Sequence, residues 1–135
     1  MSQIEYNLMP QGQVLQDFAD CRARNSFIMG PLGSGKTVQC ILKLFDLMCE
    51  QAPVSDPEHK NYGVRLSRVI AARNTYSELF STTIKDWLEI HGELGDFKQG
   101  NKEPPTHFIR FNLEDGTKVE CDVVFIAFDR PEHVK

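Results

Sequence analysis

The spacing of apolar residues in the first third of the chain predicts a helix, a strand and a second helix. Val14, Leu15 and Phe18 recur at helical spacing and predict a short amphipathic helix over residues 13–23. The compact apolar run at residues 26–29 (SFIM) predicts a buried strand. After a glycine-rich stretch, a second helix is predicted up to Pro53 by apolar residues that share one helical face: Val38, Ile41, Leu42, Phe45 and Met48.

The rest of the chain alternates in the same way and ends in a predicted hairpin. Residues 53–64 are polar and contain prolines and a glycine, which indicates a surface loop, and residues 66–72 predict a strand. A helix over 75–91 is predicted by Phe80, Ile84, Trp87, Leu88 and His91, and a loop over 92–105 by its glycines and prolines. Strands at 107–113 and 118–128 flank Glu114-Asp115-Gly116, a hairpin signal. This alternation predicts an α/β fold with a partly parallel sheet.

Composition is typical of one ordinary globular domain. The chain has 135 residues, an apolar fraction of 41% and a net charge of −4, without a basic stretch that would favour nucleic-acid binding by this domain alone. It shows neither a membrane-spanning run nor a secretory signal, so a cytosolic protein is expected. Free buried thiols in a reducing compartment, rather than metal ligands, are predicted, because no C-x-x-C pair occurs among Cys21, Cys40, Cys49 and Cys121.

One motif carries recognisable chemistry. The run GPLGSGKT matches G-x-x-x-x-G-K-[ST] at each fixed position, from Gly30 through Pro31, Leu32, Gly33, Ser34, Gly35 and Lys36 to Thr37. Glycines let backbone N–H groups turn inward onto phosphate oxygens, and a following helix adds its positive end. Lys36 is expected to reach the β- and γ-phosphates of ATP, and the Thr37 hydroxyl to ligate Mg²⁺. Lys36 and Thr37 are therefore the predicted catalytic residues, and Thr37 is the predicted metal ligand.

Four further features have both a functional and a structural interpretation. Arg73 follows the strand at 66–72 and is a candidate contact for a phosphate or a DNA strand, or else a solvated arginine. Asn74 or Thr75 is expected to cap the next helix. The apolar run ending in Asp129 is similar to a strand ending in a Mg²⁺-binding acid, but Arg130 follows where a catalytic glutamate is wanted, which favours a plain buried strand. Trp87 is expected in the core rather than as a base-stacking platform.

Three segments together resemble the large terminase subunit of tailed bacteriophages. They are residues 26–37 (SFIMGPLGSGKT), Arg73-Asn74-Thr75-Tyr76, and the Asp-Arg-Pro segment within residues 128–134. The resemblance implies a P-loop three-layer sandwich, with this chain as the N-terminal part of a single ATPase domain spanning residues 1–135 and without the nuclease domain. It also implies that the region of Gln11 and Gln13 contacts adenine.

As a function, the resemblance implies a motor that couples ATP hydrolysis to the translocation of double-stranded viral DNA into a procapsid. Its implied partners are the portal protein, the small terminase subunit and further copies in a homo-oligomeric ring, in the cytoplasm of the infected bacterial host. The acidic Mg²⁺ strand and catalytic glutamate of that family are expected beyond Lys135. We therefore expect this chain to bind ATP weakly and not to hydrolyse it at a useful rate.

Other P-loop classes remain as alternatives. A small-molecule kinase is disfavoured because residues 92–105 contain lysines but no lid arginines, and a GTPase because no Asn-Lys-x-Asp sequence occurs. A helicase-like NTPase fragment and a catalytically silent nucleotide-binding domain stay open.

Overall fold

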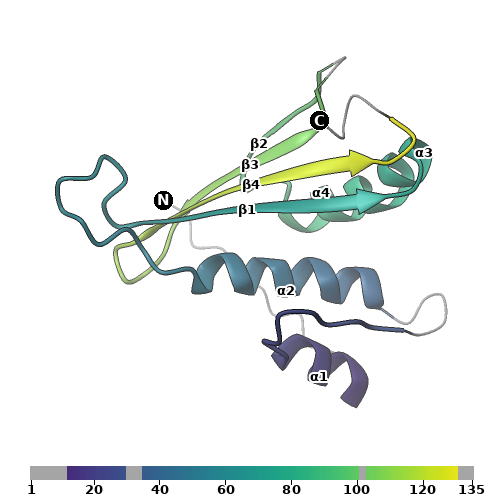
Figure 1. Cartoon of the computed structure of the whole chain (residues 1–135), viewed down its shortest axis with the longest axis horizontal. Coiled ribbons are helices and arrows are strands. Elements are labelled where there is room, and N and C mark those ends of the chain that lie inside the picture. The colour runs from purple at the N-terminus through teal and green to yellow at the C-terminus, as the bar shows by residue number, and fades with distance from the viewer. Residues whose placement is uncertain (1–11, 30–34, 101–102, 131–135) are drawn as a thin grey trace. The chain divides into compact units, whose positions relative to one another are not determined.

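The computed structural model describes residues 12–29, 35–100 and 103–130. The chain forms two compact units, Met1–Lys43 and Leu44–Lys135. Helix α2 (Lys36–Glu50), labelled in Figure 1, begins in the first unit and ends in the second. No helix among the described residues is long and apolar enough to cross a lipid bilayer.

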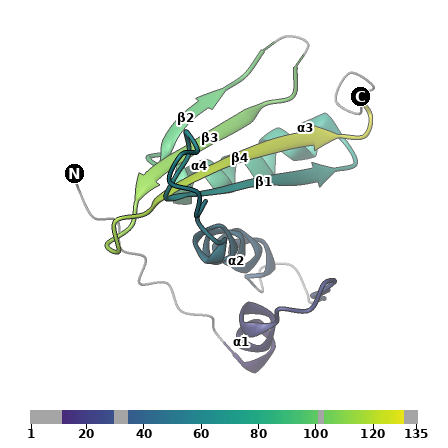
Figure 2. The ribbon, with the colours of Figure 1, turned by 60° about the vertical axis from the view of Figure 1, so that its left-hand side comes forward.

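The first unit contains α1 (Gln13–Asp20) and the start of α2, which lie next to each other (Figure 2). The predicted amphipathic helix is confirmed, although it ends earlier than residue 23. Cys21 adopts an extended conformation there, and its N–H donates to the carbonyl oxygens of Asp17 and Phe18, which closes the last turn. Ala19 is the buried residue of this helix, and Val14 remains 63% exposed.

The strand predicted at residues 26–29 is wrong. These residues form no strand, and Phe27 and Met29 are 90% and 89% exposed. An apolar run shows that a segment gains from burial, but a strand also needs a neighbour that supplies hydrogen-bond partners. Among the described residues no strand pairs with this run, so its apolar character alone does not make it part of a sheet.

The second unit contains a four-stranded mixed sheet in the order β1-β4-β3-β2. Its strands are β1 (Val64–Arg73), β2 (Gly95–Lys98), β3 (Thr106–Asn112) and β4 (Lys118–Ala127). β1 and β4 run parallel, while β3 is antiparallel to both of its neighbours. The predicted α/β class with a partly parallel sheet is therefore confirmed for this unit.

The predicted hairpin joins β3 to β4. The Leu113 N–H donates to the Thr117 carbonyl at 2.8 Å, and Gly116 has φ 88°, a conformation that favours glycine. Asp115 accepts from the Thr117 N–H and pairs with Arg65 on β1 at 3.0 Å. The hydrogen bonds from Thr117, and then the Arg65 guanidinium, lower the pKa of the Asp115 carboxyl.

Strand β2 lies inside residues 92–105, where the sequence predicted only a loop. Gly95 pairs with Ile109 on β3, and a β-carbon at Gly95 would stand 2.1 Å from the Phe108 carbonyl oxygen. Gly95 also has φ 107°. A glycine that indicates a loop in the sequence is thus required here for the close approach of two strands.

The predicted helix over 75–91 forms in three sections: α3 (Tyr76–Glu78), the π-helix η1 (Leu79–Ile84) and α4 (Lys85–His91). Thr75 is its N-cap, since the Thr75 hydroxyl accepts from the Glu78 N–H at 3.2 Å. The wider π-helical turn places Leu79 and Ile84 on the buried side, followed at α-helical spacing by Trp87 and His91. Phe80, one of the apolar residues from which this helix was predicted, is half-buried.

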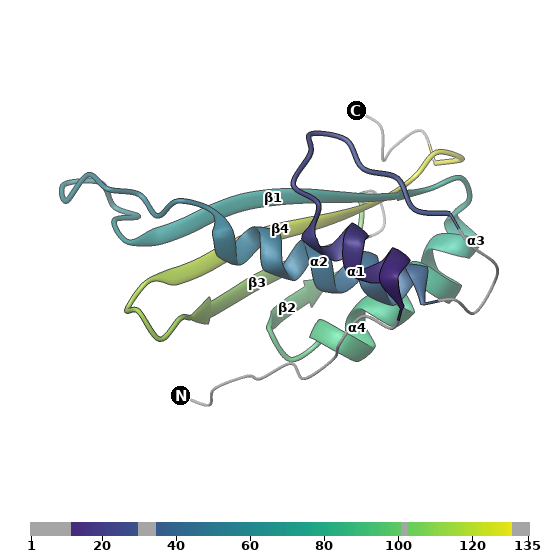
Figure 3. The ribbon, with the colours of Figure 1, turned by 90° about the horizontal axis from the view of Figure 1, so that it is seen from below.

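The core of the second unit forms on one face of the sheet. Trp87 is 1% exposed, as predicted, and its indole N–H donates to Nδ1 of the buried His107 at 2.8 Å. Phe45, at the end of α2 that belongs to this unit, is half-buried and stacks on His91 and Phe111 at ring distances of 5.4 Å. Figure 3 shows α4 in front of the sheet on this face. Burial lowers the pKa of His107.

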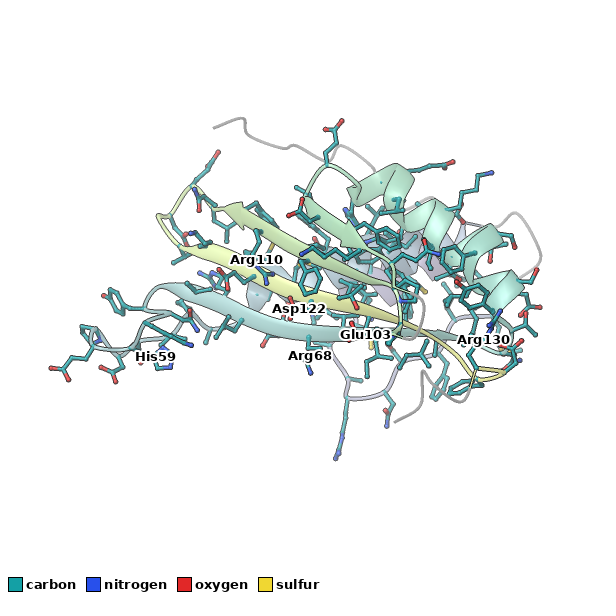
Figure 4. All side chains as sticks on the ribbon, turned by 90° about the horizontal axis from the view of Figure 1, so that it is seen from above. His59, Arg68, Glu103, Arg110, Asp122 and Arg130 are labelled. Atoms are coloured by element: carbon teal, nitrogen blue, oxygen red, sulfur yellow. The ribbon has the colours of Figure 1, made fainter. Side chains whose placement is uncertain are left out.

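The opposite face of the sheet carries charged residues. Arg110 of β3 pairs with Asp122 of β4 at 3.0 Å, and Arg68 of β1 approaches Asp122 at 4.0 Å (Figure 4). Leu66 and Ile70 of β1 are 42% and 62% exposed. The helical segments of residues 44–100 thus cover one face of this unit. The four cysteines are free thiols, and the prediction that they are buried holds for Cys121 but is wrong for Cys21, Cys40 and Cys49, which are half-buried.

Candidate functional site

The described end of the glycine-rich motif lies at the start of α2. Gly35 has φ 86°, in the left-handed region that glycine adopts readily, and its carbonyl accepts from the Gln39 N–H at 2.9 Å. Lys36 and Thr37 are the first two residues of the helix. The prediction that Lys36 opens a helix is confirmed. The accompanying prediction that a strand directly precedes the motif is wrong for residues 26–29.

This helix start has the properties that an anion requires. The first N–H groups of an α-helix have no partner within the helix, and its dipole places partial positive charge at the same end. Gly35 has Leu15 Cδ1 at 3.4 Å from the position of a β-carbon, so a larger residue there would meet both strain and a neighbour. Lys36 is half-buried and Thr37 exposed. These residues fit a phosphate group and its cation.

The remaining loop residues of the predicted site, Gly30 to Ser34, lie outside the described residues, as does Gln11. Gln13 is described and begins α1, where its side-chain amide donates to Asp17 Oδ1 at 2.6 Å. A shallow groove of about 360 Å³ lies between α1 and the segment before the loop, lined in part by Asp17, Phe18, Cys21, Phe27 and Met29. The described residues before the loop and those after it up to Lys43 belong to the first unit.

A second cluster forms where the parallel strands β1 and β4 end. The Phe128 N–H donates to the Arg73 carbonyl at 3.0 Å, and the Asp129 N–H donates to the Asn74 carbonyl at 3.1 Å. The Tyr76 N–H, at the start of α3, donates to Asp129 Oδ1 at 2.9 Å. We call these two joined segments, residues 73–76 and 128–130, the edge clasp. It lies at the carboxyl end of a parallel strand pair, where α/β sheets commonly bind ligands.

The edge clasp also holds two guanidinium groups. Arg73 has a side chain 43% exposed and lies 3.9 Å from Glu78, a weak exposed ion pair. Arg130, labelled in Figure 4, stands over the Tyr76 ring at 4.2 Å from its centroid, in a cation–π contact. Two arginines and two carboxylates at this edge balance each other in formal charge, so the clasp is not a strongly basic surface.

Asp129 has a structural role in the clasp. Its carboxylate satisfies the first N–H of the helix that follows β1, a capping role, while the strand before it buries one face through Val123, Phe125 and Ala127. This arrangement agrees with the buried-strand interpretation of the run. Asp129 itself is exposed, just after the end of β4.

Two contacts were not anticipated from the sequence. Trp87 and His107 form a buried hydrogen bond, although no sequence pattern connects a helix residue with a strand histidine 20 residues away. Lys43, on the side of α2 opposite the predicted apolar face, is only 7% exposed and bonds to Phe18 and Ser26. The helical periodicity places a lysine there on the solvent side, so the sequence carries no signal for its burial.

No protein-family model matches the chain, and comparisons with curated proteins and with solved structures gave no match either. Within the described ranges, no three His, Cys, Asp or Glu side chains gather into a group that could hold a metal ion. A magnesium ion held beside a triphosphate by one threonine hydroxyl needs no such group.

Proposed function

We propose that this chain is the ATP-binding part of a phage DNA-packaging terminase motor, a P-loop NTPase that couples ATP hydrolysis to translocation of viral DNA into the procapsid. The observation that carries the nucleotide part is the left-handed Gly35 followed at once by a helix that begins with Lys36 and Thr37. That order of conformations is what a phosphate-binding loop needs at its exit.

The fold of the second unit supports a P-loop class. Strand β1 is followed by the helix over 76–91, and the chain later returns to the sheet as β4, which is parallel to β1. Strands β2 and β3 lie between that helix and β4 in the sequence. Such alternation is the element plan of open α/β sheets that bind nucleotides. The three-layer P-loop sandwich is part of the proposal.

In this proposal each described residue of the motif has one role. Mg²⁺, when bound with ATP, neutralises charge on the β- and γ-phosphate oxygens. Lys36 places a positive charge against the same oxygens, and Thr37 offers a hydroxyl oxygen to the cation. The glycine at position 35 lets the backbone turn into α2 without a side chain beside the phosphates. Arg73 is proposed as a further anion contact at the end of β1.

The terminase part rests on the joint occurrence of three segments along the sequence. Two of them, residues 73–76 and the segment that begins at 128, are hydrogen-bonded to each other in the edge clasp. These hydrogen bonds are a physical reason for the two segments to occur together in one sequence. Double-stranded viral DNA, the portal protein, the small terminase subunit, a homo-oligomeric ring and the cytoplasm of the infected host belong to this proposal.

A nucleotide-binding domain without hydrolysis is a second candidate for the chain by itself. The observation that favours it is the use of the Asp129 carboxylate as a helix cap, which leaves that oxygen engaged with the Tyr76 N–H. We therefore expect ATP binding without steady turnover by this chain. A helicase-like P-loop fragment remains the alternative family.

The test compares ligands that differ only in their phosphates. ATP with Mg²⁺ should bind, while AMP, which lacks the β- and γ-phosphates, should bind at least about tenfold more weakly, a difference of about 1.4 kcal/mol. Removing Mg²⁺ should weaken ATP binding in the wild type but have little further effect in Thr37→Val, which lacks the cation's hydroxyl ligand. Thr82→Val, at an exposed threonine of η1, is the matched control. Equal affinity for ATP and AMP would contradict a phosphate site.

A further inference from the structure

Lys43 is a buried cation that the proposed chemistry does not use. Its side chain is 7% exposed. The ammonium group donates to the Phe18 carbonyl oxygen at 2.8 Å and to the Ser26 hydroxyl at 3.2 Å, and it lies 4.1 Å from the centroid of the Phe18 ring. Lysine is rarely buried to this degree, because removing its charge from water is costly unless the surroundings compensate.

The surroundings compensate in three ways. Phe18 is in the last turn of α1, where the helix dipole carries partial negative charge, and its carbonyl oxygen has a second lone pair beside the one that accepts from the Cys21 N–H at 3.3 Å. The ring of Phe18 attracts the same cation through its π-electrons. The Ser26 hydroxyl supplies a further acceptor. Only a long side chain with a charged donor at its tip can satisfy all three from α2.

These contacts join the segments on the two sides of the glycine-rich loop. Ser26 stands four residues before Gly30, on the chain that enters the loop. Lys43 stands seven residues after Lys36, about two helical turns along the helix that leaves the loop. All of these residues belong to the first unit. A bond between them limits how far the two ends of the loop can move apart.

We propose that Lys43 is a positioning residue for the phosphate-binding loop: its bonds to Ser26 and Phe18 fix the entering segment against the leaving helix and so raise nucleotide affinity. The inference rests on the proposed ATP site. Lys43 touches no phosphate in this account. A pre-arranged loop binds more tightly because less conformational entropy is lost when the ligand orders it.

The experiment measures two quantities on the same set of proteins. Lys43→Met keeps the length and apolar stem of the side chain but removes the charged donor. Lys43→Arg restores a charged donor, and Ser26→Ala removes one partner with little change in volume. Lys85→Met is the control, because Lys85 is an exposed lysine at the start of α4 in the other unit. Equilibrium titration gives the dissociation constant for ATP with Mg²⁺, and amide hydrogen exchange without nucleotide follows residues 26–29.

Lys43→Met is expected to raise the dissociation constant about tenfold, as loss of a hydrogen bond to a charged group commonly does. Exchange at residues 26–29 should accelerate in the same variant. Ser26→Ala should raise the dissociation constant and the exchange rate by smaller factors. Lys43→Arg should recover most of the affinity for ATP. Lys85→Met should change neither the dissociation constant nor the exchange rate.

Three results would overturn the inference. Unchanged exchange at residues 26–29 in Lys43→Met would show that the lysine does not hold this segment, whether or not nucleotide binds. Faster exchange with unchanged affinity would leave Lys43 a structural residue only. Absence of ATP binding by the wild type would instead defeat the proposed nucleotide site itself, and the positioning role with it.

Discussion

The two units differ in how deeply their large apolar side chains are buried. The second unit has a dense core in which Trp87, Phe125 and Val123 are almost fully buried. The first unit contains the glycine-rich motif, yet Phe27 and Met29 beside it are about nine-tenths exposed. The structure of the second unit depends mainly on the packing of its core. The first unit is instead distinguished by the glycine-rich motif and the backbone conformation at its end. Stability measurements should therefore report on the second unit, and ligand binding on the first.

Residues of the two units should also respond differently to substitution. A core residue is constrained by its neighbours' shapes, so its loss appears as a change in the free energy of unfolding. A motif residue such as Lys36, at the start of α2, is constrained by a ligand in the proposed function, and its loss should leave the free energy of unfolding unchanged. Four variants test this distinction.

Trp87→Ala should have the largest effect. It removes the biggest buried side chain of the second unit and leaves Nδ1 of His107 without its indole donor. We expect a loss of about 3–5 kcal/mol in the free energy of unfolding, measured by chemical denaturation. Phe27→Ala, an aromatic deletion at an exposed site, should change stability by less than about 0.5 kcal/mol. Equal losses in the two variants would contradict the contrast between the units.

Gly95→Ala should be the next most damaging change. It forces a β-carbon to within 2.1 Å of the Phe108 carbonyl oxygen at a residue with φ 107°. The backbone strain and the displaced strand should together cost about 3 kcal/mol in the free energy of unfolding. Gly116→Ala is the control, since it has a similar positive φ of 88° and nothing within 4 Å of the new methyl group. That variant should lose only about 1 kcal/mol.

Asp129→Ala should have a smaller effect, because it removes the side-chain hydrogen bond of the edge clasp, keeps its two backbone bonds and leaves the core undisturbed. The Tyr76 N–H loses its acceptor at the start of α3. Loss of a helix cap typically costs about 1 kcal/mol in the free energy of unfolding. Asp129→Asn retains an acceptor oxygen and should recover much of that loss, as thermal denaturation can show. A destabilisation as large as that of Trp87→Ala would mean that the clasp is part of the core.

The smallest expected effect is a pH dependence that comes from His107. Burial lowers its pKa in the folded protein below the ordinary value of 6.5, so protonation favours the unfolded chain. Stability from this residue is fully present above pH 6.5 and falls as pH drops below that value, until the folded-state pKa is reached. Urea denaturation at pH 7.5 and pH 5 should show a smaller decrease in His107→Gln than in the wild type. His59→Gln, at an exposed histidine, should behave like the wild type.

Much of the second unit could be predicted from the sequence, since its strands and helices have clear periodicity and the Asp115-Gly116 turn fixes the hairpin. Thr75 as a helix cap was likewise predictable from its place before an apolar helical run. The π-helical turn was not, because one extra residue per turn depends on how Leu79 and Ile84 pack against the sheet. Strand β2 was missed because Gly95 indicates a loop unless its close neighbour Phe108 is known.

At the candidate site the position of Lys36 was predictable and the surroundings were not. A motif of fixed spacing determines where the helix begins, while the behaviour of residues 26–29 depends on partners distant in the chain. Lys43 shows a similar limit: its contacts with Phe18 and Ser26 join residues 25 and 17 positions away. Long-range contacts of this kind are not visible in local periodicity.

The decisive measurement is titration calorimetry of ATP with Mg²⁺ into the wild type and into Lys36→Ala. We expect measurable binding by the wild type, loss of that binding in Lys36→Ala, and the same free energy of unfolding for both proteins. Binding that persists unchanged in Lys36→Ala, or absence of heat with either protein, would contradict a phosphate site at the start of α2.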